Sequence, residues 1–259
     1  MRMNPLRRYE KIMELLLAER EVTVAKLTEQ LRVTGKTIRE DLAKLEEKGL
    51  LARIHGGAVL AQENQLGILS PKPAAVPNEA ERSETAAAAI ALIGPHDVIA
   101  LDGGRTTLEM ARRLPDQPMT VVTNDLFILA ELARKEQIRL VVPGGYQYRN
   151  MLIGSEAEAY IRKLNISKAF LSATGVHPTY GFTIYAGESV QLKRAWLETA
   201  KASYVVADHY KFGQAALFTF AKLSEVEAII TDSGIEAETA ELFRQEGTHI
   251  LIHGREGQS

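Results

Sequence analysis

The sequence lacks cysteine entirely among its 259 residues. This absence excludes disulfide bonds, thiolate metal sites and cysteine nucleophiles, and it is typical of proteins of a reducing cytoplasm, where we expect this chain to act. A run of about 18 apolar residues is also missing, so no membrane span is predicted. The charged N-terminal residues contain no apolar segment of a secretion signal.

The chain also carries little net charge, because 31 Lys and Arg residues stand against 33 Asp and Glu residues, for a formal net charge of −2. The distribution is less even than the total. Residues 1–60 hold 12 basic and 9 acidic side chains, and the remainder holds 19 and 24. A basic N-terminal part on an acidic body has the sign expected of a DNA-binding protein, but this asymmetry is too mild to establish one.

Three short helices are predicted in the N-terminal part from apolar side chains at helical spacing. Thr23 is the expected N-cap of the second helix, and Thr34 is the expected N-cap of the third. The apolar stripe of the first helix is formed by Ile12, Leu15, Leu16 and Leu17. Residues 50–59 then predict two short β segments joined by a glycine turn. This order predicts a small winged helix-turn-helix domain over residues 1–60.

Residues 61–80 contain three prolines and no clear period, which predicts an interdomain linker. Over 81–259, strand-like runs alternate with amphipathic segments, which predicts a larger Rossmann-like α/β domain with a mostly parallel sheet and helices on both faces. Trp196 and Tyr204 are expected in its core. The predicted strands are 98–101, 119–123, 138–142, 168–172, 203–207, 227–231 and 249–252, and the predicted helices lie at 106–114, 126–135, 188–200 and 236–246.

The third predicted helix carries the candidate DNA contacts. Its inward face is Ile38, Leu42 and Leu45, and its opposite face presents charged and hydroxyl side chains near the N-terminus. In helix-turn-helix proteins these positions meet base edges in the major groove, where Arg and Lys suit guanine. A charged face that only meets solvent is the alternative. The candidate DNA-binding residues, with expected phosphate contacts from the first helix and the wing, are Arg8, Thr34, Lys36, Thr37, Arg39, Arg53 and His55.

Three short motifs connect this domain with a known family. They read TIREDL from Thr37 to Leu42, LEEKG from Leu45 to Gly49, and RIHGGA from Arg53 to Ala58. On these motifs the first 60 residues resemble the DNA-binding head of the DeoR family, which implies a double-stranded DNA operator as partner. One departure is Glu40, which replaces a usually basic residue and can accept from cytosine or pair with Lys44.

Small polar residues follow several predicted strands of the body, where ligands bind in parallel sheets. The turn DGGRTT at 102–107 runs from a strand into a helix, so its backbone N–H groups and the helix dipole suit a phosphate. Arg105 and Lys211 add positive charge. Each glycine turn alone is weak support, because glycine is a common way to leave a strand, but their shared position predicts one pocket.

Residues from about Arg82 to Asp232 resemble the C-terminal sensor domain of the DeoR family, whose fold is similar to that of ribose-5-phosphate isomerase. The resemblance implies a phosphorylated sugar or sugar alcohol as effector. Thr174 departs from the carboxylate of the isomerase-like enzymes, and Arg105 replaces a small hydroxyl residue. The candidate effector-binding residues are Asp102, Gly104, Arg105, Thr106, Thr107, Thr123, Asn124, Gly144, Gly145, Gly175, Glu188 and Lys211. A helix-terminal charge is the alternative role of Glu188.

The sequence therefore predicts a ligand-responsive DNA-binding regulator, most often a repressor in this family, of a sugar or sugar-alcohol operon. Two heads that read two half-sites imply a homodimer or homotetramer. The alternatives are a sugar-phosphate isomerase, although Thr174 removes a general base, and a regulator whose body only oligomerises. No cofactor and no metal is predicted, because His177 and His209 lack partners at metal-ligand spacing and are expected at the surface.

Overall fold

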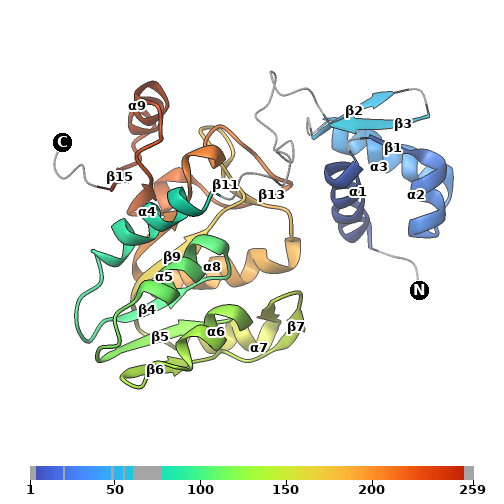
Figure 1. Cartoon of the computed structure of the whole chain (residues 1–259). Coiled ribbons are helices and arrows are strands. Elements are labelled where there is room, and N and C mark those ends of the chain that lie inside the picture. The colour runs from blue at the N-terminus through green and yellow to red at the C-terminus, as the bar shows by residue number, and fades with distance from the viewer. Residues whose placement is uncertain (1–3, 20, 48–49, 55, 61–77, 254–259) are drawn as a thin grey trace.

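The computed structural model describes residues 4–19, 21–47, 50–54, 56–60 and 78–253. Its N-terminal part is the predicted winged helix-turn-helix, here called the reading head (Figure 1). The three helices are α1 (Pro5–Glu19), α2 (Val24–Leu31) and α3 (Gly35–Glu47), and the strands are β1 (Glu21–Thr23), β2 (Leu51–Ile54) and β3 (Gly57–Leu60). The strands form an antiparallel sheet in the order β1-β3-β2, so the wing gains one strand that the sequence did not predict.

Local hydrogen bonds explain where the helices of the reading head begin. The Thr23 side chain accepts from Lys26 N at 3.2 Å and caps α2, and Thr34 Oγ1 accepts from Thr37 N at 3.2 Å and caps α3. Both predicted caps are confirmed. Gly57 permits the close pairing of β3 with β1, because a Cβ atom there would lie 2.2 Å from Val22 O.

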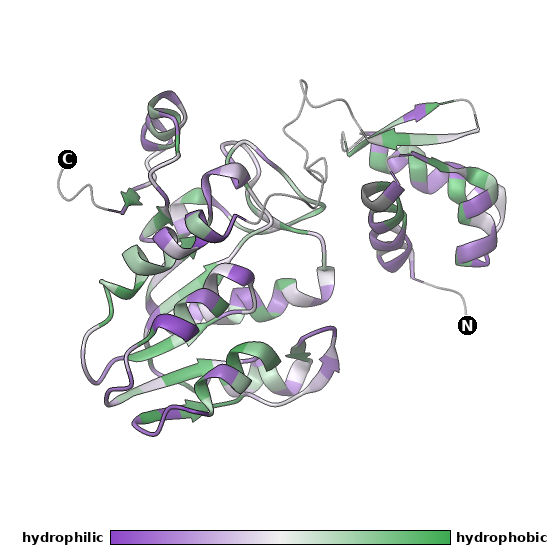
Figure 2. Ribbon diagram, in the orientation of Figure 1, coloured by the Kyte–Doolittle hydropathy of each residue, from purple (hydrophilic) through white to green (hydrophobic). Residues whose placement is uncertain are grey.

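The larger domain, here called the body, is built on a parallel sheet with the strand order β15-β14-β12-β9-β4-β5-β6. All seven predicted strands are present within a few residues of their predicted bounds, and Figure 2 shows that strands such as β4 and β5 are largely hydrophobic along their length. The strands are β4 (Val98–Leu101), β5 (Met119–Thr123), β6 (Ile138–Val141), β9 (Ile166–Ser172), β12 (Ala200–Val206), β14 (Ala228–Thr231) and β15 (Ile250–Ile252).

Helices cover both faces of this sheet, as predicted. One buried cluster joins the sheet to α4 (Glu79–Ile90), α5 (Arg105–Arg113) and α6 (Leu126–Leu132). A second cluster on the other face joins it to α7 (Ser155–Ile161), α8 (Val190–Thr199) and α9 (Ala237–Gln245). Trp196 is fully buried in the second cluster, and the ring of Tyr204 stacks on Phe170 at 5.5 Å between centroids, which confirms both core predictions.

Two smaller β structures were not predicted, because their strands of three or four residues are too short for a clear period. One is the hairpin of β7 (Tyr146–Tyr148) and β8 (Met151–Ile153). The other is a sheet of β10 (Gly175–His177), β11 (Gly181–Ile184) and β13 (Phe218–Ala221). Single 3-10 turns lie at Gly187–Ser189 (η1), His209–Lys211 (η2) and Leu223–Glu225 (η3).

The predicted linker falls mostly on residues 61–77, which lie outside the described residues. Its last two residues belong to α4, so the body begins at Glu79, two residues before the predicted boundary. The described helices include none with the length and apolar character that a membrane crossing requires.

Candidate functional site

The outward face of α3 matches the predicted DNA-reading surface. Ile38, Leu42 and Leu45 are buried in the core of the reading head. Thr34, Lys36 and Arg39 are exposed, Thr37 is half-exposed, and Glu40 is exposed without an ion pair to Lys44 among the described side chains. The face therefore offers cationic and hydroxyl groups to a groove, and contact with DNA stays a prediction.

The prediction of a phosphate contact for Arg8 is corrected by the structure. Arg8 is 8% exposed, and its guanidinium donates to both carboxylate oxygens of Asp41, from Nε at 2.7 Å and from Nη2 at 2.9 Å. This bidentate pair joins α1 to α3 inside the reading head. Arg53 is exposed on the wing, where its Nε lies 2.6 Å from Glu46 Oε2, and His55 lies outside the described residues.

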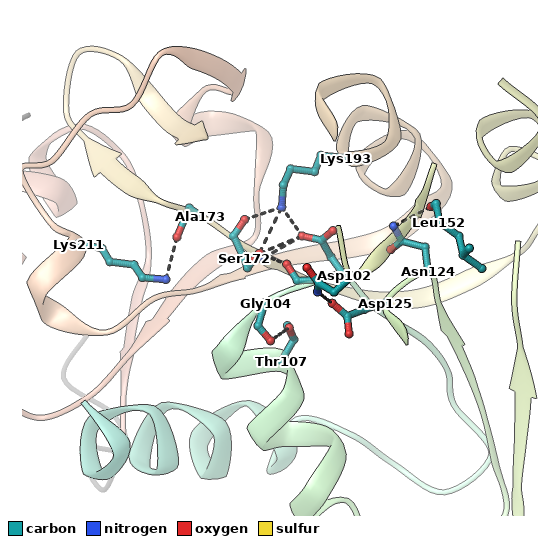
Figure 3. Close-up of polar contacts among 12 residues, drawn as sticks. Asp102, Gly104, Thr107, Asn124, Asp125, Leu152, Ser172, Ala173, Lys193 and Lys211 are labelled. Carbon is teal, nitrogen blue, oxygen red and sulfur yellow. Dashed lines mark hydrogen bonds and ion pairs between the residues drawn. The ribbon is translucent and has the colours of Figure 1, made fainter. Parts of the chain in front are cut away.

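The predicted phosphate turn lies between β4 and α5 (Figure 3). Thr107 Oγ1 donates to Gly104 O at 2.9 Å, while Thr106 Oγ1 is buried with no partner among the described residues. Arg105 is exposed at the start of the helix. The turn thus places the N-terminus of a nine-residue helix beside a buried hydroxyl without a partner among the described residues, an arrangement that suits an oxyanion.

Replacing Gly104 by alanine should disable this turn. A Cβ atom at Gly104 would lie 2.5 Å from Ser172 Cβ and 2.7 Å from its Oγ, so the turn must move away from β9. Hydrogen bonds to charged groups contribute about 1.5–3 kcal/mol each, so losing one from the turn should weaken phosphate binding about tenfold or more. Titration calorimetry with sugar phosphates measures the loss. Gly94→Ala is the matched control, because a Cβ atom there meets only Asp97 Oδ2, at 3.7 Å.

A buried ion pair between Asp102 and Lys193 supports the turn from the other side. Lys193 lies on α8, is 3% exposed, and contacts Asp102 Oδ2 while donating to Ser172 O at 2.7 Å. Asp102 also accepts from Ser172 N at 3.2 Å. The sequence did not single out Lys193. The available signal was its place beside Leu192 and Trp196, on the apolar side of a predicted helix.

Lys211 adds a further cation to the same region, as predicted. Its Nζ donates to Ala173 O at 2.8 Å (Figure 3). Burial lowers the pKa of Lys211, and the charges of Arg105, Lys193 and Arg82 lower it further, whereas Asp208 opposes them. A bound anion would offset this mutual repulsion of cations. We name Arg82, Arg105, Lys193 and Lys211 the cation cluster.

The predicted Thr123 and Asn124 are buried at the end of β5. Thr123 Oγ1 accepts from Asp125 N at 3.2 Å, so its role is at least partly local. Asn124 Nδ2 donates to Leu152 O at 3.1 Å, which leaves Asn124 Oδ1 buried without a partner among the described residues. Asp125 caps α6 by accepting from Phe127 N and Ile128 N, and burial raises its pKa. Asn124 Oδ1 therefore presents an acceptor suited to a hydroxyl group.

The predicted glycines have structural explanations of their own. Gly145 has a φ of +105°, and a Cβ atom there would lie 2.3 Å from Ile153 O across the β7–β8 hairpin. Gly175 lets Gln214 O approach to 2.3 Å from its Cβ position. Gly144 has a φ of +82° and open space around it. Close backbone packing or the left-handed conformation thus accounts for each glycine without a ligand.

Two histidines and Glu188 remain among the side chains that the sequence singled out. Among the described residues no group of three His, Asp or Glu side chains is arranged to hold a metal ion. His177 Nδ1 accepts from Thr179 N at 3.1 Å, and His209 Nδ1 lies 2.5 Å from Asp232 Oδ2. Both histidines are partly exposed to solvent. Glu188 lies in η1 next to α1 of the reading head.

Comparisons with known proteins agree with this two-part organisation. Residues 8–64 match the DeoR-like helix-turn-helix domain, and residues 77–233 match the DeoR C terminal sensor domain. The chain is 36% identical over 234 residues to the transcriptional repressor AccR of Agrobacterium fabrum, covering 88% of this chain and 89% of that relative. It is 30% identical over 230 residues to the L-fucose operon activator of Haemophilus influenzae, covering 88% and 92% of the two chains.

Similar solved structures are more distant. Ribose 5-phosphate isomerase A of Methanocaldococcus jannaschii has a TM-score of 0.40 and 18% identity, covering 52% of this chain and 55% of that chain. The translation initiation factor eIF-2B of Pyrococcus horikoshii OT3 has a TM-score of 0.45 and 16% identity, covering 88% and 86%. These likenesses concern the fold alone.

Proposed function

Because the chain belongs to the DeoR family of transcriptional regulators, we propose that it represses a sugar or sugar-alcohol operon and that a phosphorylated sugar controls this repression. One relative named above is a transcriptional repressor, and another is the activator of an L-fucose operon. The sign of regulation proposed here follows the repressor, to which the chain is 36% identical.

The cation cluster is the observation that carries the effector proposal. Lys211 and Lys193 are held near Arg105 and the N-terminus of α5, and burial, together with the cationic neighbours, lowers the pKa of Lys211. An oxyanion bound at the turn would satisfy these charges together with the free Thr106 hydroxyl. Asn124 Oδ1 and Asp208 Oδ1 are buried without donors among the described residues, so hydroxyl groups on the same molecule would satisfy them.

A thermal-shift panel tests the effector proposal. Ribose 5-phosphate, fructose 6-phosphate and glycerol 3-phosphate are compared with their unphosphorylated forms, and at a concentration of about 100 times Kd a ligand should stabilise the folded chain by about 2.7 kcal/mol. The effect should fall in Arg105→Ala and persist in Arg113→Ala, a surface arginine at the other end of α5. If no sugar phosphate raises Tm, the body serves oligomerisation alone. Turnover of any of them would instead support an isomerase, for which Thr174 offers no general base.

We also propose that a homodimer or homotetramer presents two reading heads to a repeated operator. Replacing Arg39 by alanine should weaken binding to that operator by about 1–3 kcal/mol, the value of one good side-chain contact to a base. The comparison is a fluorescence-anisotropy titration at several salt concentrations. Lys44→Ala is the control on the same helix, because Lys44 is exposed in the last turn of α3 and is not among the predicted DNA-binding residues. Equal affinity of Arg39→Ala and the wild type would remove this face of α3 from the DNA interface.

A further inference from the structure

The reading head touches the body through two glutamates on one face of α1. Gly187 N, in η1 of the body, donates to Glu10 Oε1 at 2.5 Å. Arg149, at the tip of the β7–β8 hairpin, forms an ion pair with Glu14 one helical turn further along. Tyr185 and Leu217 of the body pack against the hydrophobic core of the reading head. We call this contact the head–body contact.

The same hairpin reaches back to the phosphate turn. Tyr148 pairs with Met151 across the hairpin, and a Cβ atom at Gly103 would lie 2.8 Å from Met151 Sδ. Asn150, next to Met151, contacts the Asp125 carboxylate. The tip of one short hairpin therefore contacts both the phosphate turn, through Met151, and α1, through Arg149.

Two carboxyl groups meet where the head–body contact adjoins the candidate site. Glu10 is 7% exposed, and its carboxyl group lies close to that of Glu188, which stands two residues before α8 and its Lys193. Glu188 Oε2 is buried without a donor among the described residues. A buried acceptor needs a donor, and two groups can supply one here. One is the protonated carboxyl group of Glu10 in the docked head, and the other is a hydroxyl group of a bound sugar.

We propose that the docked reading head and a bound sugar phosphate compete for Glu188, so that the effector releases the reading head from the body. This inference rests on the proposed function of the body. A sugar hydroxyl that donates to Glu188 Oε2 occupies the acceptor that a protonated Glu10 would otherwise use, so the two donors exclude each other. The phosphate binds at the turn against which Met151 lies, next to the hairpin tip whose Arg149 holds Glu14.

Release of the reading head would lower operator affinity without a direct contact between effector and DNA. The groove-facing side chains Lys36 and Arg39 stay exposed while α1 is docked, so docking is compatible with DNA binding. Docking also fixes the orientation of each head in an oligomer. Two pre-oriented heads bind two half-sites with less loss of freedom than two released heads, which is the basis of the coupling.

Docking should depend on pH in a stated direction. Burial raises the pKa of Glu10 from 4.5 to about 7, Glu188 and Glu14 contribute to the rise, and the Gly187 N–H opposes it. The other titratable groups that face this position are Tyr148, Arg149 and Tyr185. Docking therefore takes up a proton, so the docked form is favoured at low pH. The equilibrium constant for docking falls by up to about tenfold per pH unit as the pH rises from 4.5 to about 7.

The absence of cysteine makes the test direct. Spin labels on Glu29→Cys, in α2, and Glu238→Cys, in α9, attach to two exposed positions with no background thiol. Pulsed dipolar spectroscopy should show a narrow distance distribution at pH 5.5 and a broader one at pH 8. Ribose 5-phosphate, fructose 6-phosphate and glycerol 3-phosphate are then added at pH 5.5. Each compound that raises Tm should also broaden the distance distribution.

Glu10→Gln separates the proton from the rest of the contact. The amide can donate to Glu188 and accept from Gly187 N at every pH, so this variant should stay docked at pH 8 and need about tenfold more sugar phosphate for release. Glu21→Gln, an exposed neutralisation on β1, should keep the wild-type profile. A sugar phosphate that raises Tm but leaves the distances unchanged overturns the competition and leaves the proposed function standing. A panel without any stabilising compound overturns the proposed function and the competition, while the pH series still decides whether Glu10 controls docking.

Discussion

Lys193→Met is expected to lower the free energy of unfolding by about 3–5 kcal/mol, because removing one partner of a buried ion pair leaves the other charge uncompensated. Asp102 is 1% exposed and would keep only the neutral donors of Ser172. Methionine matches the length of the lysine stem and fills the space beside Phe220, whose ring centroid lies 4.9 Å from Lys193 Nζ. Urea denaturation followed by tryptophan fluorescence reports on the body, since Trp196 is its probe.

A double variant distinguishes charge from packing in this prediction. In Asp102→Asn combined with Lys193→Met no uncompensated charge remains, so most of the lost stability should return. Arg162→Met is the surface control, because the Arg162–Glu198 pair is 42% and 45% exposed and contributes less than about 1 kcal/mol. If Lys193→Met and Arg162→Met were equally stable, the ion pair of Lys193 would not support the phosphate turn. Sugar-phosphate binding should be lost in Lys193→Met and return only in part in the double variant.

Arg8→Ala is expected to destabilise the reading head by about 3 kcal/mol. The side chains of Arg8 and Asp41 are 10% and 4% exposed, and the substitution would leave the Asp41 carboxylate without its two donated bonds. Hydrogen exchange of the amides of α1 and α3 should accelerate by about two orders of magnitude if they exchange through unfolding of the head, since every 1.4 kcal/mol is tenfold. Operator affinity should fall as a consequence.

Two further variants show whether this effect comes from the buried pair. Lys26→Ala removes an exposed pair with Glu19 in the same domain and should change stability by less than about 1 kcal/mol. Arg8→Lys keeps the charge but not the bidentate geometry, so an intermediate loss is expected. Lower operator affinity of Arg8→Ala at unchanged hydrogen exchange would instead return Arg8 to the phosphate-contacting role that the sequence suggested.

The strands and helices with a strong pattern were predicted well. The runs at 98–101 and 119–123 became β4 and β5 with unchanged bounds, because strands buried on both faces are continuous apolar runs that only a covered parallel sheet accommodates. The inward face of α3 followed from helical spacing in the same way. The β7–β8 hairpin escaped prediction, because three residues show no period and its pairing depends on the turn at Arg149, with a φ of +54°.

The candidate site was predicted in its backbone and less completely in its side chains. The glycine turn before α5 and Lys211 could be found, because strand ends in a parallel sheet share one edge. Lys193 comes from a helix on the opposite face of the sheet from α5, and only packing of α8 brings it to Asp102. The prediction for Arg8 was wrong for a related reason. Its sequence neighbours suggested an exposed basic residue, but the packing of α3 places Asp41 against it.

By itself, the sequence determined which segments form the winged head and the parallel body, and it placed a glycine turn at the start of a helix, because helix caps, apolar period and glycine positions act over a few residues. Tertiary structure alone decided which charges meet. The Arg8–Asp41 and Asp102–Lys193 pairs, and the approach of Glu10 to Glu188, join residues far apart in the chain. Coulombic attraction and the cost of burying a charge depend on distance in space and on exposure, and neither quantity exists until the chain has packed.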